Sequence, residues 1–89
     1  MKGKFELGQV VITRNAANTI NEADAANALS RHASGDWGEC CREDRKTNDE
    51  ALKNDDRIFS VYRDSNDVKF WIITEHDRSA TTILLPEDY

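Results

Sequence analysis

Alternation of polar and apolar positions marks the last third of the chain as three β-strands. Residues 57–63 (RIFSVYR) alternate, and residues 68–74 (VKFWIIT) are apolar almost throughout, as is typical of a central strand. Residues 80–85 (ATTILL) form the third stretch. Because the polar clusters at 64–67 and 75–79 are short, we expect these strands to pair as an antiparallel meander.

Helical spacing replaces this alternation in the middle of the chain. Asn21 has the chemistry of an N-cap, and it precedes a predicted helix over residues 22–33. The apolar face of that helix is Ala25, Ala28, Leu29 and His32. A second helix is predicted over residues 43–54, where Ala51 and Leu52 are the only apolar residues. A helix this polar is expected to form a solvated cover over a sheet.

The N-terminal part adds one more strand. Residues 5–13 are rich in β-branched residues, with a bend expected at Gly8, and residues 15–21 are predicted to be a loop. The order β-α-α-β-β-β predicts an α+β fold, with two helices packed on one face of a small antiparallel sheet. At 89 residues the chain is expected to be a single domain, residues 1–89.

Charge narrows the possible partners. The chain has 12 Lys and Arg against 17 Asp and Glu, a net charge of −5. Residues 21–56 hold ten acids and five bases, so they alone carry a net charge of −5. This balance disfavours direct binding to nucleic acid and suits docking on a basic partner. The chain has no long apolar run, and we expect neither a membrane span nor a secretory signal.

Soft metal ligands are few and poorly spaced. They are His32, Cys40, Cys41 and His76. The adjacent cysteines do not match the spaced pairs of structural zinc sites, and they are expected to be reduced thiols, one buried and one exposed at a helix start. We therefore expect no metal and no cofactor.

The segment from His32 to Gly38 (HASGDWG) permits two interpretations. In the structural one, His32 bonds a backbone carbonyl or Asp36 at a helix end, and Trp37 covers the core beneath the helices. In the functional one, His32 is a general acid or base, and Asp36 sets its tautomer.

The polar turn at residues 75–79 also permits two interpretations. Arg78, together with nearby hydroxyl groups and Arg57 or Arg63, has the donors to hold a phosphate. Alternatively the segment is an ordinary turn, in which Asp77 accepts from the Ser79 amide and Arg78 pairs with an acid.

Three stretches carry a resemblance to a known family: KFELGQVVITRNA, RHASGDWGE and FWIITEHDRSATTILLPEDY. Together they resemble the short "plasmid-related" proteins carried by plasmids, conjugative elements and phages. The resemblance implies a cytoplasmic accessory protein of a mobile genetic element in a bacterial host. It implies no particular activity.

The first hypothesis is an inhibitor of the anti-CRISPR or anti-restriction type, which docks on a basic host protein or nucleoprotein complex and acts either by steric blocking or by mimicking DNA. The predicted binding residues are Asp36, Trp37, Asp44, Asp49, Glu50, Asp55 and Asp56. An exposed apolar edge strand would also allow a homodimer.

The alternative is a metal-independent toxin-type ribonuclease with a barnase-like or RelE-like site. His32 would be the acid or base, and Arg57, Arg78 and Thr81 would hold the phosphate. The acidic charge weighs against an RNA substrate, and we expect a protein that is not an enzyme. Structural and regulatory roles remain open beside both hypotheses.

Overall fold

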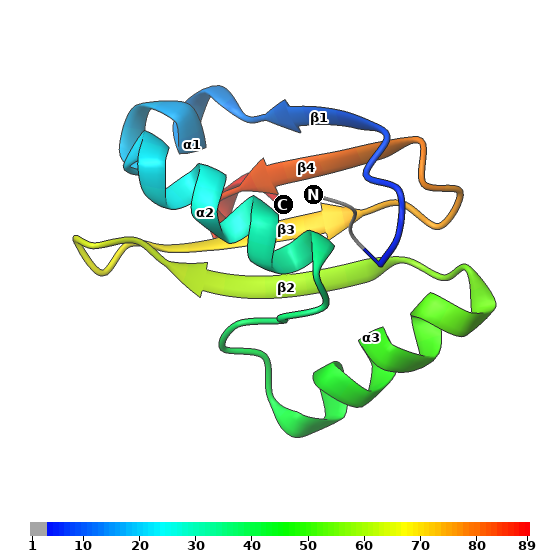
Figure 1. Cartoon of the computed structure of the whole chain (residues 1–89). Helices are drawn as coiled ribbons and strands as arrows, with labels where there is room; N and C mark the ends of the chain where they lie inside the picture. The colour runs from blue at the N-terminus through cyan, green and yellow to red at the C-terminus, as the bar shows by residue number, and fades with distance from the viewer. Residues whose placement is uncertain (1–3) are drawn as a thin grey trace.

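Four strands form one mixed sheet in the computed structural model, which describes residues 4–89 (Figure 1). They are β1 (Gln9–Ile12), β2 (Ile58–Arg63), β3 (Lys69–Thr74) and β4 (Ala80–Leu84). Their spatial order is β1-β4-β3-β2. The β2–β3 and β3–β4 pairs are antiparallel, which confirms the predicted meander.

The helices complete the predicted α+β fold. They are α1 (Arg14–Thr19), α2 (Glu22–Ala33), α3 (Arg42–Asn54) and the 3-10 helix η1 (Pro86–Asp88). Asn21 caps α2 as predicted, because its side chain accepts a hydrogen bond from the Asp24 amide at 3.2 Å. The main difference in secondary structure is α1, which lies where a loop was predicted.

Long-range contacts explain why α1 forms. The Thr13 hydroxyl accepts from the Ala16 amide at 3.1 Å and donates to the Asp88 carboxylate at 2.7 Å. Ala16 is fully buried in the main core. A helix of six residues is too short to be stable alone, so it depends on this cap and this packing, which are not visible in local sequence.

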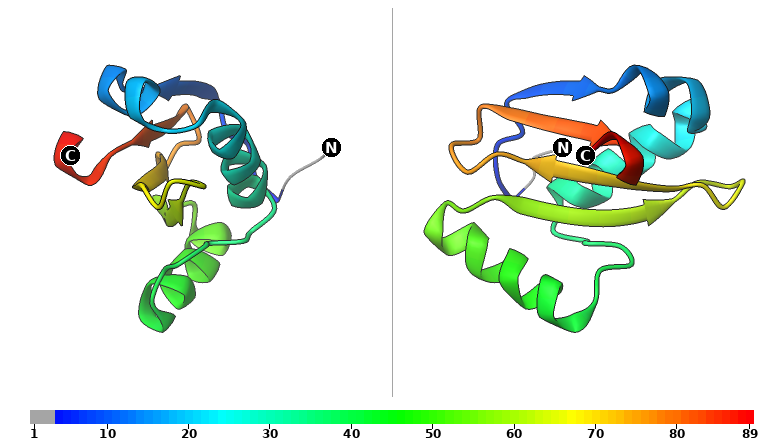
Figure 2. Two further views of the ribbon diagram at one scale, coloured as in Figure 1. Left: turned by 90° about the vertical axis from the view of Figure 1, so that its left-hand side faces the viewer. Right: turned by 180° about the vertical axis from the view of Figure 1, so that it is seen from behind.

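The prediction of a wholly antiparallel sheet is wrong at β1, which runs parallel to β4. The Gln9 amide donates to the carbonyl of Ser79, which directly precedes β4, and the Thr13 amide donates to the carbonyl of Ile83 in β4, both at 3.0 Å. Parallel neighbours need a long connection. Here almost the whole chain lies between β1 and β4, including α2, which crosses one face of the sheet (Figure 2). Because β1 is the first strand in the spatial order and pairs only with β4, it is an edge strand of the sheet.

The main core lies between α2 and the sheet. Ala25 and Ala28 of α2 pack against a row of large side chains on the inner face. These are Tyr62, Phe70, Ile72 and Ile83. The alternation that predicted the strands therefore also selects which side chains face α2.

The second predicted helix does not share that face. Instead α3 lies along the outer edge of β2, as both views in Figure 2 show. Its buried strip is narrow and includes Asn48 and Ala51. The Asn48 side-chain amide donates to the Phe59 carbonyl and accepts from the Phe59 amide, so it pairs with β2 as another strand would.

We expect Asn48→Ala to lower the free energy of unfolding by about 2 kcal/mol, because it leaves the backbone groups of the half-buried Phe59 without their partners. Urea denaturation checks this value. Asn54→Ala is the matched control, since Asn54 is exposed at the end of α3, and it should change stability by less than about 0.5 kcal/mol. Equal losses in the two variants would contradict the role of Asn48 at this edge.

Candidate functional site

A chain of hydrogen bonds crosses the interior and has His32 at its centre. The imidazole Nδ1 bonds the Ser60 hydroxyl, and Nε2 lies 2.8 Å from the Thr74 hydroxyl. The chain continues from Thr74 to Thr81 at 2.8 Å, and the Thr81 hydroxyl donates to the Leu7 carbonyl at 2.7 Å. This buried polar chain (Ser60, His32, Thr74, Thr81) links α2 to β2, β3 and β4, and all four side chains are inaccessible to solvent.

Aromatic rings enclose the imidazole on its remaining sides. The Phe5 and Trp37 ring centroids lie 5.3 Å and 5.9 Å from that of His32, both edge to face. Burial, assisted by the positive charge of Arg78, lowers the pKa of His32 to about 3. His32 is therefore neutral at physiological pH, and both of its nitrogens have partners. These are the properties of a structural histidine.

Arg78 uses its donors inside the fold. Its guanidinium donates to the carbonyls of Asp56 at 2.7 Å, Ala51 at 3.1 Å and Glu75 at 3.1 Å. Two of these carbonyls lie at the C-terminal end of α3, so Arg78 caps that helix from the β3–β4 turn. Its guanidinium carbon also lies 5.6 Å from the Phe5 ring centroid, and Phe5 thus contacts both Arg78 and His32.

The four proposed nuclease residues do not share an open site. Thr81 joins His32 through Thr74 in the buried polar chain. Arg57 instead donates to the Tyr89 hydroxyl at 2.8 Å and lies over its ring. Tyr89 packs against Trp71, whose side chain faces away from α2, because strand residues alternate between the two faces. This geometry does not favour the ribonuclease.

Asp36 and Trp37 also have structural partners. The Asp36 carboxylate pairs with the Arg31 guanidinium at 2.8 Å, and this hydrogen bond lowers the pKa of Asp36. Ser60 and Thr74, rather than Asp36, therefore set the tautomer of His32. Trp37 is buried, as expected of a core residue, and its indole donates to Asp49 at 3.0 Å.

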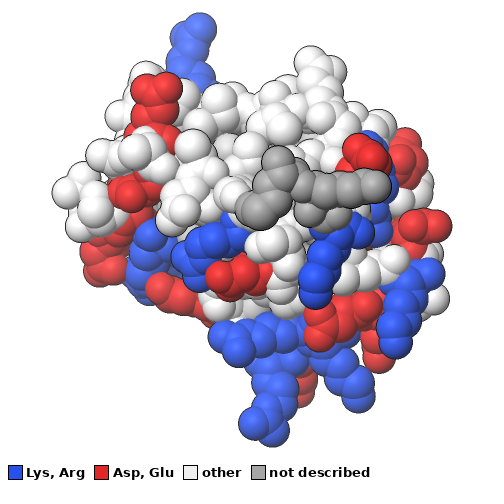
Figure 3. Space-filling view, in the orientation of Figure 1, with Lys and Arg blue, Asp and Glu red and all other residues white. Residues whose placement is uncertain are grey.

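The acids predicted on α3 are mixed with bases. Asp44, Asp49 and Glu50 are exposed, but the helix also exposes four bases. These are Arg42, Arg45, Lys46 and Lys53. Lys46 and Lys53 are seven residues apart and so share the face opposite the buried strip. Figure 3 accordingly shows Lys and Arg side chains gathered at the end of the molecule that α3 forms.

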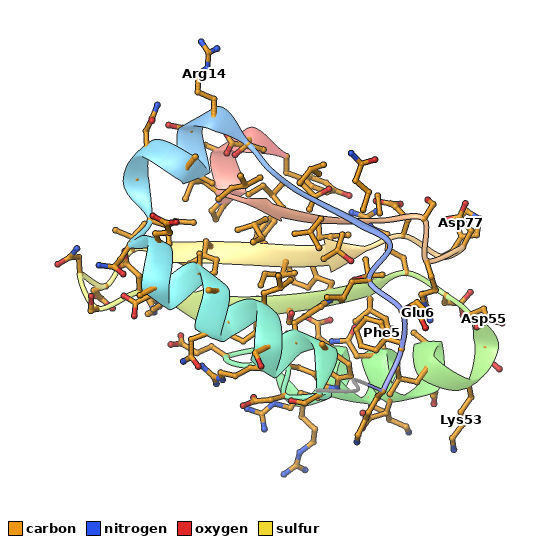
Figure 4. The ribbon with its side chains drawn as sticks, turned by 45° about the horizontal axis from the view of Figure 1, so that its top comes forward. Phe5, Glu6, Arg14, Lys53, Asp55 and Asp77 are labelled. Atoms are coloured by element: carbon orange, nitrogen blue, oxygen red, sulfur yellow. The ribbon has the colours of Figure 1, made fainter. Side chains whose placement is uncertain are left out.

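Asp55 and Asp56 have a different environment. They follow α3, and Arg78 holds the β3–β4 turn, which carries Glu75 and Asp77, against this end of the helix. Figure 4 shows Asp55 and Asp77 at the same end of the molecule, with Lys53 pointing away from them. We call the four acidic residues of these two segments (Asp55, Asp56, Glu75 and Asp77) the acidic end. Sequence reasoning missed Glu75 and Asp77 because they are distant from α3 along the chain.

The thiols lie as predicted. Cys40 is buried, and burial raises its pKa, while Cys41 is exposed at the start of α3. Within residues 4–89 no three His, Cys, Asp or Glu side chains converge as metal ligands would. None of the helices described for these residues is long and apolar enough to cross a membrane.

Comparison with known proteins adds no relative. The chain matches no protein-family model, no curated protein and no solved structure. The resemblance to plasmid-related proteins therefore stays a prediction, and a functional proposal must come from the geometry.

Proposed function

We propose that this protein acts by binding, as an accessory protein of a mobile genetic element that blocks a host protein complex in the bacterial cytoplasm. The observation that carries the proposal is the use of His32, Thr81 and Arg78 in hydrogen bonds within the fold. Their chemistry serves stability, which leaves the surface as the functional part of the molecule.

The acidic end is the part of that surface best suited to a basic partner. Its four carboxylates come from two segments, and they add to the partial negative charge at the C-terminus of α3. A host complex that binds DNA presents Lys and Arg side chains toward phosphate groups. Acidic residues that the Arg78 contacts bring to one end of the molecule can compete for those side chains by charge complementarity.

Affinity capture from a bacterial lysate tests the proposal. We expect the tagged protein to retain a host complex that salt elutes, because exposed charge pairs are screened. Asp55→Lys/Asp77→Lys should weaken this binding by about tenfold or more, since it reverses two charges at the contact. The matched control Asp44→Lys/Glu50→Lys makes the same change in net charge on α3 and should bind within about threefold of the unaltered protein.

Three outcomes would contradict the proposal in different ways. A larger loss in the control variant would place the docking surface on α3. If the tagged protein retained no host complex, the proposed binding function would be wrong. If the same preparation cleaved RNA and His32→Gln abolished the cleavage, the ribonuclease hypothesis would take its place.

A further inference from the structure

The free edge of the sheet at β1 is apolar and exposed. Val10, Val11 and Ile12 are 43%, 39% and 43% exposed, and with Tyr89 they are the large apolar side chains most accessible in residues 4–89. The amides of Gln9 and Thr13 donate toward β4. Because backbone groups alternate in direction along a strand, those of Val10 and Ile12 face outward at the edge.

The two edges of the sheet differ in this respect. At the β2 edge, Asn48 satisfies both backbone groups of Phe59, and residues 37–39 satisfy those of Val61. Strand edges that present backbone groups and apolar side chains together are sites for pairing with another strand. At the β2 edge the chain itself occupies this pairing site, whereas the pairing site at the β1 edge is free among the described residues.

We propose that β1 pairs with β1 of a second copy of this chain, antiparallel about a two-fold axis through Val11. This register places Val10 opposite Ile12 of the second copy, so the outward backbone groups of these residues form hydrogen-bonded pairs. Apolar side chains then face apolar ones across the axis, and Gln9 faces Thr13. The two sheets become one continuous sheet of eight strands.

Charge supports the antiparallel arrangement. Arg14 extends outward at the C-terminal end of β1 (Figure 4). A two-fold axis places the Arg14 side chains of the two copies at opposite ends of the paired strands. Parallel pairing would instead bring the two like charges of Arg14 and Arg14 side by side. Charge therefore favours one orientation of two paired β1 strands over the other.

The strand is short, which limits the strength of the dimer. β1 has four residues, and Gly8 turns the chain away with a φ of 65°. An interface of this length lies below the usual size of stable complexes. We therefore expect a dissociation constant of about 10–100 μM, corresponding to about 5–7 kcal/mol.

Sedimentation velocity and amide exchange together test the dimer. Between about 5 μM and 500 μM the protein should pass from monomer to dimer, as follows from the expected dissociation constant. The amides of Val10 and Ile12 should exchange more slowly at the higher concentration. A monomer throughout this range, with exchange at Val10 and Ile12 independent of concentration, would overturn the proposal.

Variants distinguish this edge from the rest of the surface. Val10→Lys should abolish the dimer, whereas Tyr89→Lys, which changes an apolar side chain that is 72% exposed, should leave it unchanged. Val11→Lys should also abolish the dimer, because it places two like charges opposite each other at the two-fold axis. Loss of the dimer in Tyr89→Lys but not in Val10→Lys, or an intact dimer in Val11→Lys, would overturn the β1 arrangement. The dimer needs no host partner, so its failure leaves the proposed function untouched.

Discussion

Lowering the pH from 7 to 4 should destabilise the fold by roughly 3 kcal/mol through His32 alone. The pKa of His32 is about 3 in the folded protein, against 6.5 for an ordinary histidine. Below pH 6.5 the unfolded chain binds a proton that the folded chain does not, so the stabilisation is complete above pH 6.5 and is lost as the pH falls toward 3. Urea denaturation at pH 7, 5.5 and 4 measures the loss.

The two histidines provide a matched pair for this experiment. His32→Gln should remove most of the dependence on pH between 6.5 and about 5, although it lowers stability at pH 7 because the bonds to Ser60 and Thr74 are altered. Some loss should remain below about pH 5, because carboxylates whose pKa the fold lowers, such as Asp36, bind protons more readily in the unfolded chain. His76→Gln should retain the dependence, since His76 lies in the exposed β3–β4 turn. An equal slope in His32→Gln and the unaltered protein would show that His32 is not the group responsible.

Gly38→Ala should cost about 4 kcal/mol of folding free energy, because two separate penalties coincide there. The φ of Gly38 is 69°, which disfavours any residue with a Cβ atom. A Cβ at this position would also lie 1.9 Å from the Val61 carbonyl oxygen, where residues 37–39 pair with the edge of β2. Backbone cannot rotate out of the way as a side chain can, so the pairing itself must break. Thermal and urea unfolding both measure this loss.

A variant at Gly35 distinguishes the cost of backbone strain from the cost of a steric clash. Its φ is 87°, but a Cβ there would meet the Lys4 side chain, with Cδ at 3.0 Å, and that chain is free to move. Gly35→Ala should therefore cost only the backbone strain, about 1–2 kcal/mol. If both variants lost the same stability, the close approach of Gly38 to Val61 would not be a constraint on the fold.

Local patterns predicted the parts of this fold that depend on local interactions. The strands of the meander alternate and are separated by short polar turns, and α2 has its cap at Asn21. The parallel pairing of β1 could not be predicted, because it joins residues about 70 positions apart. Likewise α1 depends on Asp88, which lies 75 positions from Thr13.

The candidate site shows the same limit. The four-residue spacing of His32 and Asp36 suggested a catalytic pair, but Ser60 and Thr74, 28 and 42 positions away, are the partners of the imidazole. The charge count located acidity in residues 21–56, yet the acidic end draws half of its carboxylates from the β3–β4 turn. Composition gives the amount of charge, whereas tertiary contacts decide where it gathers.

The buried polar chain also constrains how this sequence can diverge. If an apolar residue replaced His32, the hydroxyl groups of Ser60 and Thr74 would lose partners in the interior, at a cost for each. Simultaneous replacement of the whole set by apolar residues of similar shape would cost far less. Positions 32, 60, 74 and 81 should therefore vary together among descendants of this chain, and their joint pattern would identify a distant relative after its surface has lost all similarity.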